Sequence, residues 1–190
     1  MKEMVEVRWH ARAGQGAKTA ALLLAEAALH EGKYIQGFPE YGPEREGAPI
    51  KAFTRISGKP ILIHCGVANP DAVVLLDTTL LGAVDVTEGL LEDGALLINT
   101  EKSPEEIRKT LKTEKGKVFT VDATGISLDL LGRNLPNMPM IGALVKVLPV
   151  VKLETLLESV KKKFGKKFSS KIVEGNVSAI KRAYEEVKSE

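Results

Sequence analysis

Short apolar segments alternate with longer amphipathic segments along the chain, and this alternation predicts the fold class. Buried-strand patterns are expected at residues 5–9, 34–38, 71–76, 95–99 and 118–121. Because helical patterns separate most of them, the strands need crossover connections and the sheet needs cover on both faces. The pattern therefore predicts an α/β fold of three layers, α/β/α, with a mostly parallel sheet.

Helical periodicity predicts helices of different character along the chain. The segments lie at 17–30, near 86–92, and at 103–112, 123–132, 140–148, 153–164 and 169–188. The first is apolar over most of its circumference and should be well buried, whereas 153–164 is amphipathic. The last carries an apolar stripe at Val173, Val177, Ile180, Tyr184 and Val187. That stripe fits packing on its own domain or, alternatively, docking on another subunit.

Proline and glycine punctuate the strand patterns in two places. The apolar runs 50–57 and 60–64 flank a Gly-Lys pair, so an antiparallel hairpin is expected there. Residues 39–49 hold three prolines and two glycines, which exclude a regular element and predict a loop. A stiff irregular segment of this kind is typical of a recognition surface, although a structural ion pair is the alternative role for Arg45.

Composition narrows the classes of protein and of site. Apolar residues make up 44% and charged residues 27% of the sequence, which suits one compact soluble domain over 1–190. The C-terminal helices of 153–188 are then part of that domain or packed on it. Cys65 is the only cysteine, so this chain by itself forms no internal disulfide and ligates no iron–sulfur cluster. Three scattered histidines do not predict a metal site.

Charge and hydropathy point to location and partners. No apolar run is long enough to cross a bilayer and the N-terminus lacks a secretory pattern, so a cytoplasmic protein without membrane association is expected. The net charge is +2, but residues 160–190 hold nine basic and four acidic residues. This region is either a solvated helix face or a contact for an acidic partner. Nucleic acid is not expected, because no aromatic residues interleave with the lysines.

A glycine-containing turn, HARAGQGAKT at 10–19, joins the first strand pattern to the first helical one. Turns in this position of α/β sheets bind anions, because backbone amides can approach a phosphate and the helix N-terminus is electropositive. Arg12 and Lys18 could add charge, and Thr19 a hydroxyl. The spacing is not that of a Walker A loop, and Thr19 occupies the third glycine position of the dinucleotide fingerprint. A phosphate contact and a plain tight turn therefore both remain possible.

Other reactive residues carry weaker signals. His64 and Cys65 are adjacent, but neighbours in a strand point to opposite faces, so they are not expected to form a nucleophilic pair. Asp77 and Asp122 follow strand patterns, where the ligands of open sheets gather, and are equally suited to cap the helices that follow. No pattern indicates a catalytic triad or a paired-carboxylate site.

Three motifs together resemble one family. They are HARAGQGAKTA at 10–20, FPEYGPEREGAP at 38–49 and NMPMIGAL at 137–144. In these segments the chain resembles the gamma subunit of 2-oxoacid:ferredoxin oxidoreductases, most closely those of the pyruvate:ferredoxin oxidoreductase type. The resemblance extends over about residues 4–188 and implies a single gamma-type domain. The chain departs from the family in having Ala11 and Ala13 where glycine is common, and Glu46 where a basic residue is common.

The resemblance implies a subunit of an enzyme that converts a 2-oxoacid, coenzyme A and oxidised ferredoxin to acyl-CoA, CO2 and reduced ferredoxin. The implied cofactors of the complex are thiamine diphosphate with Mg²⁺ and [4Fe–4S] clusters, held by alpha, beta and delta subunits. This chain is expected to contribute assembly and the coenzyme A site, and no catalytic acid, base or nucleophile. The residues expected to contact the cofactor are Arg12, Gly14, Gln15, Gly16 and Thr19. Those expected at the subunit or coenzyme interface are Tyr41, Glu44 and Arg45.

Several alternatives remain open at this point. The oxoacid could be pyruvate, a branched-chain 2-oxoacid, indolepyruvate or 2-oxoglutarate, and one gamma chain could serve two such enzymes. Outside the family, the chain could be a stand-alone nucleotide- or coenzyme-binding module, or a scaffold whose basic C-terminal region tethers an acidic protein.

Overall fold

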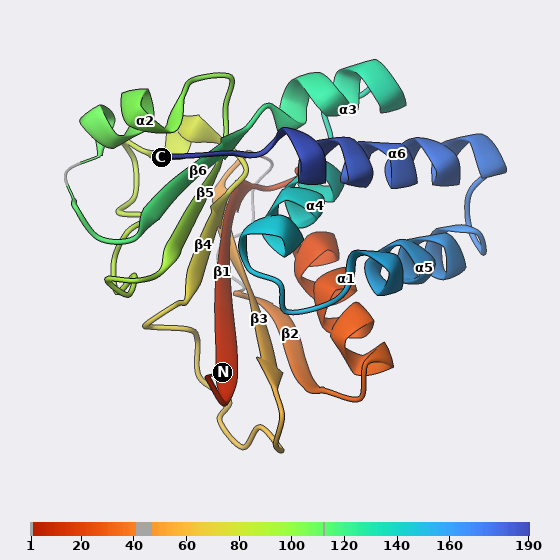
Figure 1. Ribbon diagram of the computed structural model, residues 1–190, viewed down its shortest axis with the longest axis horizontal. Coiled ribbons are helices and arrows are strands. Elements are labelled where there is room, and N and C mark those ends of the chain that lie inside the picture. The colour runs from red at the N-terminus through yellow and green to blue at the C-terminus, as the bar shows by residue number, and fades with distance from the viewer. Residues whose placement is uncertain (1, 41–46, 112) are drawn as a thin grey trace.

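A seven-stranded mixed sheet forms the centre of the molecule in the computed structural model, which describes residues 2–40, 47–111 and 113–190 (Figure 1). The strands lie in the order β2-β3-β1-β4-β5-β6-β7. Their bounds are β1 Met4–Arg12, β2 Tyr34–Glu40, β3 Pro49–Ser57, β4 Ala72–Leu75, β5 Ala95–Asn99, β6 Lys117–Val121 and β7 Lys188–Ser189. Strands β1, β4, β5 and β6 are parallel, whereas β3 is antiparallel to both β1 and β2, and β7 is antiparallel to β6. The predicted fold class, a three-layer α/β fold with a mostly parallel sheet that contains an antiparallel hairpin, is confirmed, although other strands than expected form the hairpin.

Helices and a short 3₁₀ turn complete the described part of the chain. They are α1 Ala17–His30, η1 Thr78–Leu80, α2 Pro104–Thr110, α3 Ala123–Leu131, α4 Asn137–Val147, α5 Leu153–Phe164 and α6 Ser170–Glu186. The prediction of a helix near residues 86–92 is wrong, because this segment forms turns. Gly89 has φ +68, and a Cβ there would lie 1.9 Å from the carbonyl oxygen of Ala68. A helix through this position would lose that close approach of two backbones.

The hairpin is formed by a different pair of strands from the pair predicted. Residues 60–64 form no strand. The reason is that both edges of β3 are already occupied, by β1 on one side and by β2 on the other. The true hairpin is therefore β2–β3. The expected loop 39–49 is shorter than predicted, since β2 continues to Glu40 and β3 begins at Pro49; residues 41–46 lie outside the described residues.

Two apolar layers cover the faces of the sheet. The larger core lies between the sheet and α1, α3, α4, α5 and α6, and it includes Trp9 of β1. The smaller core lies under η1, the segment after it and α2. The strand period of two produces this division, since Val74 of β4 joins the larger core and Val73 and Leu75 join the smaller one. The three predicted layers are therefore present.

The C-terminal helices pack on the rest of the chain. Val177 and Ile180, members of the apolar stripe of α6, are buried in the larger core, and α6 lies against α3, α4 and α5. Of the two roles expected for the stripe, packing on its own domain is the one observed. Within the described residues, no helix combines the length and the apolar character that a membrane-spanning segment needs.

Candidate functional site

The glycine turn lies where it was predicted, between a strand and a helix. β1 ends at Arg12 and α1 begins at Ala17. The two glycines between them have positive φ angles, 99° at Gly14 and 81° at Gly16, so the chain reverses through conformations that side chains rarely adopt. Because β1, β4, β5 and β6 run parallel, the turn lies at their common carboxyl edge, the usual ligand-binding edge of open α/β sheets.

The structure brings together two motifs that are far apart in the sequence. Asn137, at the start of α4, lies directly against Gly16, and its Nδ2 atom donates to the Gly16 carbonyl at 3.4 Å across 121 positions of sequence. A Cβ at position 16 would lie 2.4 Å from that same nitrogen. A side chain at position 16 would therefore force the Asn137 side chain to move, so Gly16 and Asn137 are closely packed against each other.

Arg12 is anchored within the protein. Its Nε atom donates to Thr79 Oγ1 at 2.8 Å, and its Nη1 atom donates to the Gly47 carbonyl at 2.9 Å. The Nε atom also lies 3.7 Å from Asp77 Oδ2. The guanidinium therefore ties the turn to the end of β4 and to the segment that precedes β3. These bonds use two of the five N–H donors of the guanidinium.

Gln15 and Asp77 complete this network. Gln15 accepts from the Arg12 amide at 2.8 Å and donates to Asp77 Oδ2 at 2.7 Å. The other Asp77 oxygen accepts from the Thr79 amide and hydroxyl at 2.9 and 2.6 Å. Burial opposes ionisation of Asp77, but the hydrogen bonds from Thr79 and Gln15 and the charge of Arg12 outweigh it and lower its pKa. Asp77 is thus an ionised cap of η1 that also holds the turn.

The first turn of α1 presents main-chain donors beside this network. No side chain caps the helix at Gly16, and the first intrahelical bond is donated by the Ala20 amide to the Gly16 carbonyl at 3.0 Å. Ala20 is the fourth residue of the helix, so the N–H groups of the first turn lie ahead of the helical hydrogen-bond ladder and point along the helix axis. Thr19 lies in this turn and is half-buried. Donors of this kind, at a helix N-terminus, can receive an anion.

The remaining predicted candidates fall into three groups. Tyr41, Glu44 and Arg45 lie outside the described residues. Asp122 accepts from the Gly125 amide at 2.7 Å and so caps α3, which is one of its two expected roles. Cys65 is exposed.

A buried polar pair next to the turn was missed by the sequence reasoning. His10 is only 2% exposed, and its Nε2 atom accepts a hydrogen bond from Arg8 Nε at 3.0 Å. Arg8 also donates to the carbonyls of Val86 and Glu88. Burial, followed by the positive charges of Arg8 and Lys51, lowers the pKa of His10 to about 3. The imidazole is therefore neutral. The alternation of polar residues along β1 places Arg8 and His10 on the same face of the sheet, and this was the signal that could have predicted the pair.

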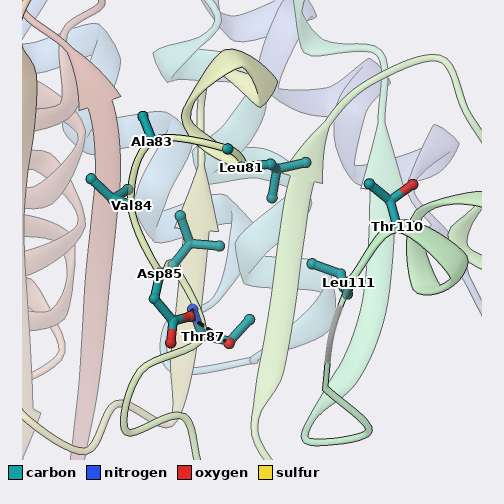
Figure 2. A pocket seen from close by; sticks show the side chains of 9 residues that line it. Leu81, Ala83, Val84, Asp85, Thr87, Thr110 and Leu111 are labelled. Carbon is teal, nitrogen blue, oxygen red and sulfur yellow. Dashed lines mark hydrogen bonds between the residues drawn. The ribbon is translucent and has the colours of Figure 1, made fainter.

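A pocket of about 520 Å³ lies on the smaller core and is separate from the turn network. Figure 2 shows residues 81–87 on one side of it, with Thr110 and Leu111 from the end of α2 on the other. Asp85 accepts from the Thr87 amide and hydroxyl at 2.9 and 2.7 Å, and these bonds lower its pKa. One oxygen of the Asp85 carboxylate is thus already hydrogen-bonded to Thr87, two residues along the chain. Across the described residues, no three His, Cys, Asp or Glu side chains gather to hold a metal.

Comparison with known proteins agrees with this fold. The family model described as pyruvate ferredoxin/flavodoxin oxidoreductase matches residues 6–186. The chain is 53% identical to pyruvate synthase subunit PorC of Thermotoga maritima, over 98% of this chain and 96% of that protein. It is 50% identical to the common gamma subunit of the pyruvate/ketoisovalerate oxidoreductases of Pyrococcus furiosus, over 96% of each.

A solved structure matches over the same length. The crystal structure of pyruvate oxidoreductase subunit PORC from Thermotoga maritima superposes with a TM-score of 0.87, at 49% identity and 99% coverage of both chains. The match therefore includes both the sheet and the C-terminal helices. The predicted resemblance is confirmed: the chain belongs to the pyruvate ferredoxin/flavodoxin oxidoreductase family.

Proposed function

We propose that this chain is the gamma subunit of a pyruvate:ferredoxin oxidoreductase. The complex would convert pyruvate, coenzyme A and oxidised ferredoxin to acetyl-CoA, CO2 and reduced ferredoxin. The observation that carries the proposal is the identity of 53% and 50% to proteins named as such subunits, over nearly the whole of each chain. We further propose a cytoplasmic location.

The single cysteine of this chain indicates that other subunits ligate the iron–sulfur clusters of the complex. A [4Fe–4S] cluster needs four thiolate ligands, and the sequence holds one cysteine. We therefore assign the clusters to companion subunits, which pass electrons on to ferredoxin. The family resemblance further implies that alpha, beta and delta subunits hold the clusters, thiamine diphosphate and Mg²⁺. Thiamine diphosphate supplies the carbanion chemistry of decarboxylation when it is bound. The gamma chain supplies binding surface and no reacting group.

Coenzyme A is the ligand proposed for the glycine turn. Its phosphates are anions of the kind that main-chain amides at a helix N-terminus receive, and α1 begins beside Gly16 with no side-chain cap. The space beside Gly14 is open, since a Cβ there would meet nothing within 4 Å among the described atoms. Arg12 and Gln15 act by holding the turn, while Gly16 and Thr19 belong to the first turn of the helix.

The 41–46 segment is proposed to complete the site. Its two following residues contact the turn directly, because Ala48 accepts from the Ala13 amide and Gly47 accepts from Arg12, both at 2.9 Å. Tyr41, Glu44 and Arg45 precede Gly47 by six, three and two positions along the chain. We assign them to the interface with coenzyme A or with a neighbouring subunit.

The first experiment tests the function itself. The alpha, beta and delta subunits are expressed with and without this chain, and pyruvate-dependent viologen reduction is measured in the presence of coenzyme A. Activity is expected only when the chain is present. Full activity of a complex without it would overturn the proposal.

The second experiment tests the turn. Gly14→Ala adds a methyl group in the open space, and Gly32→Ala is its matched control, since both glycines have positive φ and no neighbour within 4 Å. Gly14→Ala should raise KM for coenzyme A about tenfold, equivalent to one lost contact of about 1.4 kcal/mol. KM for pantetheine, which lacks the phosphates, should not change. Equal effects on the two substrates would contradict a phosphate contact at the turn.

Two alternative functions predict different results from the proposed one in binding and activity assays. The Pyrococcus furiosus relative is named as a gamma subunit common to two oxidoreductases. If this chain has the same shared role, complexes with other companion subunits should also oxidise 2-ketoisovalerate. A stand-alone coenzyme-binding module would instead bind coenzyme A with micromolar affinity in calorimetry without any partner. Indolepyruvate and 2-oxoglutarate are tested as substrates in the same way.

A further inference from the structure

We propose that the outer end of the helical layer is a docking surface for an acidic face of a companion subunit. This inference rests on the proposed function. Figure 1 shows α3, α5 and α6 projecting together away from the sheet, with the α5–α6 connection at the outermost point. We call the apolar side chains exposed at this end the distal patch; they are Leu128, Leu130, Phe168 and Ile172. Its basic rim is Lys161, Lys162, Lys166, Lys167 and Lys171.

The apolar side chains of the distal patch are more exposed than the fold requires. Four of the eight large apolar side chains exposed in the described part of the chain belong to it, with exposures of 50% at Leu128, 48% at Phe168 and 44% at Ile172. Ile172 lies beside the buried stripe of α6 rather than within it, so the core does not account for its apolar character. Such a concentration at one end of a molecule marks an interaction site rather than scattered exposure.

The two helices that carry the distal patch meet at this end. A Cβ at Gly175 would lie 3.0 Å from Leu131 Cδ2 and 3.1 Å from the Leu130 carbonyl, so the end of α3 lies over the first turns of α6. Ile172 is one helical turn before Gly175. The exposed apolar side chains of α3 and of the start of α6 therefore lie at the same end of the molecule.

The basic rim gives this surface a strong charge. Residues 160–175 hold six lysines and one glutamate, a net charge of +5 in a chain whose total is only +2. Lys163 pairs with Glu26 of α1 at 2.6 Å. Among the residues that the structure describes, the five lysines of the rim form no ion pair. Their charge is therefore available to a partner.

An acidic protein fits this surface better than the other possible partners. An apolar centre with a charged rim is the anatomy of a protein–protein interface, and a positive rim requires a negative counterpart. A second copy presenting the same patch would be repelled. Stacked nucleotides need a series of aromatic rings, whereas Phe168 lies edge-on to Phe164 at 5.5 Å. A membrane-bound helix needs a free apolar face, but that of α6 is buried.

The first test reverses the charge of the rim in the whole complex. The triple variant Lys166→Glu, Lys167→Glu, Lys171→Glu is co-expressed with the companion subunits and compared with a control of equal charge change, Lys102→Glu, Lys109→Glu, Lys115→Glu. The control lysines are exposed and lie on or beside α2. Dissociation constants come from dilution series by mass photometry at two ionic strengths.

The rim variant should raise the dissociation constant at least about tenfold and flatten its salt dependence, whereas the control should change it less than about twofold. A second pair of variants tests the apolar centre without a change in charge. Phe168→Ser with Ile172→Ser should weaken assembly by a similar factor, and Leu62→Ser, at 84% exposure the most exposed of the large apolar residues described, should not. Circular dichroism and thermal unfolding verify that each variant is folded.

The outcomes separate this inference from the function on which it rests. If the wild-type chain retains no companion subunit, the proposed function fails. If it assembles and the rim variant assembles equally well, only the docking surface is overturned. It is also overturned if the wild-type complex binds RNA or vesicles of phosphatidylcholine and phosphatidylglycerol, and the rim variant loses that binding while keeping its subunits.

Discussion

Replacing Gly16 by alanine should destabilise the protein through a clash with one identified side chain. The new Cβ would lie 2.4 Å from Asn137 Nδ2 and 2.9 Å from its Cγ atom. Overpacking of this kind costs about 1–3 kcal/mol, and the positive φ of 81° adds about 1–2 kcal/mol for any residue other than glycine. The free energy of unfolding should therefore fall by about 2–5 kcal/mol.

A double-mutant cycle separates the two contributions. Asn137→Ala should cost about 1 kcal/mol, because it removes a long hydrogen bond of 3.4 Å whose acceptor, the Gly16 carbonyl, keeps its bond from the Ala20 amide. Combining it with Gly16→Ala removes the obstacle, so the double variant should be more stable than the sum of the single variants predicts, by about 1–3 kcal/mol. Urea unfolding followed by circular dichroism measures each corner of the cycle.

Gly32→Ala provides the control for backbone strain. Gly32 has φ 75°, close to that of Gly16, but a Cβ there would meet nothing within 4 Å. This variant should show only the strain of about 1–2 kcal/mol and no coupling to Asn137→Ala. A coupling energy between positions 16 and 137 within about 0.5 kcal/mol of zero would refute the claim that Gly16 and Asn137 are closely packed against each other.

Three further predictions concern the polar groups around the turn and at the sheet edge. The pKa of His10 is lowered to about 3 in the folded protein, so the unfolded chain binds more protons between about pH 3 and 6.5. As pH falls from 7 to 5, the free energy of unfolding of the wild type should therefore decrease by about 2 kcal/mol more than that of His10→Gln. An equal decrease for both proteins in urea unfolding would contradict this. Asp77→Asn should raise KM for coenzyme A in the assembled complex more than it lowers kcat, because Asp77 bonds to Gln15 and Thr79 and so holds the turn that we propose receives coenzyme A; a loss confined to kcat would speak against a positioning role. Glu190→Ala should lower the free energy of unfolding by about 1–3 kcal/mol, since Glu190 accepts from both Arg108 and the Val118 amide, while Glu185→Ala at an exposed position should have little effect.

Elements with strong local signals could be predicted from the sequence almost residue by residue. The bounds of α1, α5 and β5 in the structure coincide with the segments expected at 17–30, 153–164 and 95–99. In each case periodicity and flanking residues act within a few positions of the chain, so no distant contact decides the outcome. The strand–turn–helix placement of the candidate site followed from the same local information.

Elements that depend on distant partners could not be predicted in this way. The strand expected at 60–64 is absent because β1 and β2 occupy both edges of β3, a pairing that local patterns do not contain. The helix expected near 86–92 is replaced by turns, whose carbonyls at Val86 and Glu88 accept from Arg8, about 80 positions earlier. Tertiary hydrogen bonds here override a local helical pattern.

The same distinction applies within the candidate site. The glycines of the turn were visible in the sequence, but the residues that hold them were not connected to it. Asp77 bonds to Gln15 across 62 positions and Asn137 bonds to Gly16 across 121. Asp77 was expected only as a ligand or as a cap, and its third role, as an anchor of the turn, arises because β4 lies next to β1.

Ala11 and Ala13 lie beside the glycine turn in positions that do not require glycine. The resemblance to the family implies glycine at positions 11 and 13, where this chain has alanine. Within the described residues every positive φ belongs to glycine, so neither alanine is in a conformation that requires one. Ala11 is buried in the larger core, and the Ala13 amide donates to the Ala48 carbonyl. The two alanines therefore leave Gly14 and Gly16 as the positions where the turn depends on glycine. Because Gln15 bonds to Asp77 and Arg12 bonds to Thr79 and Gly47, these side chains hold the turn, and the Gly14→Ala variant tests the phosphate contact that we propose for its main chain.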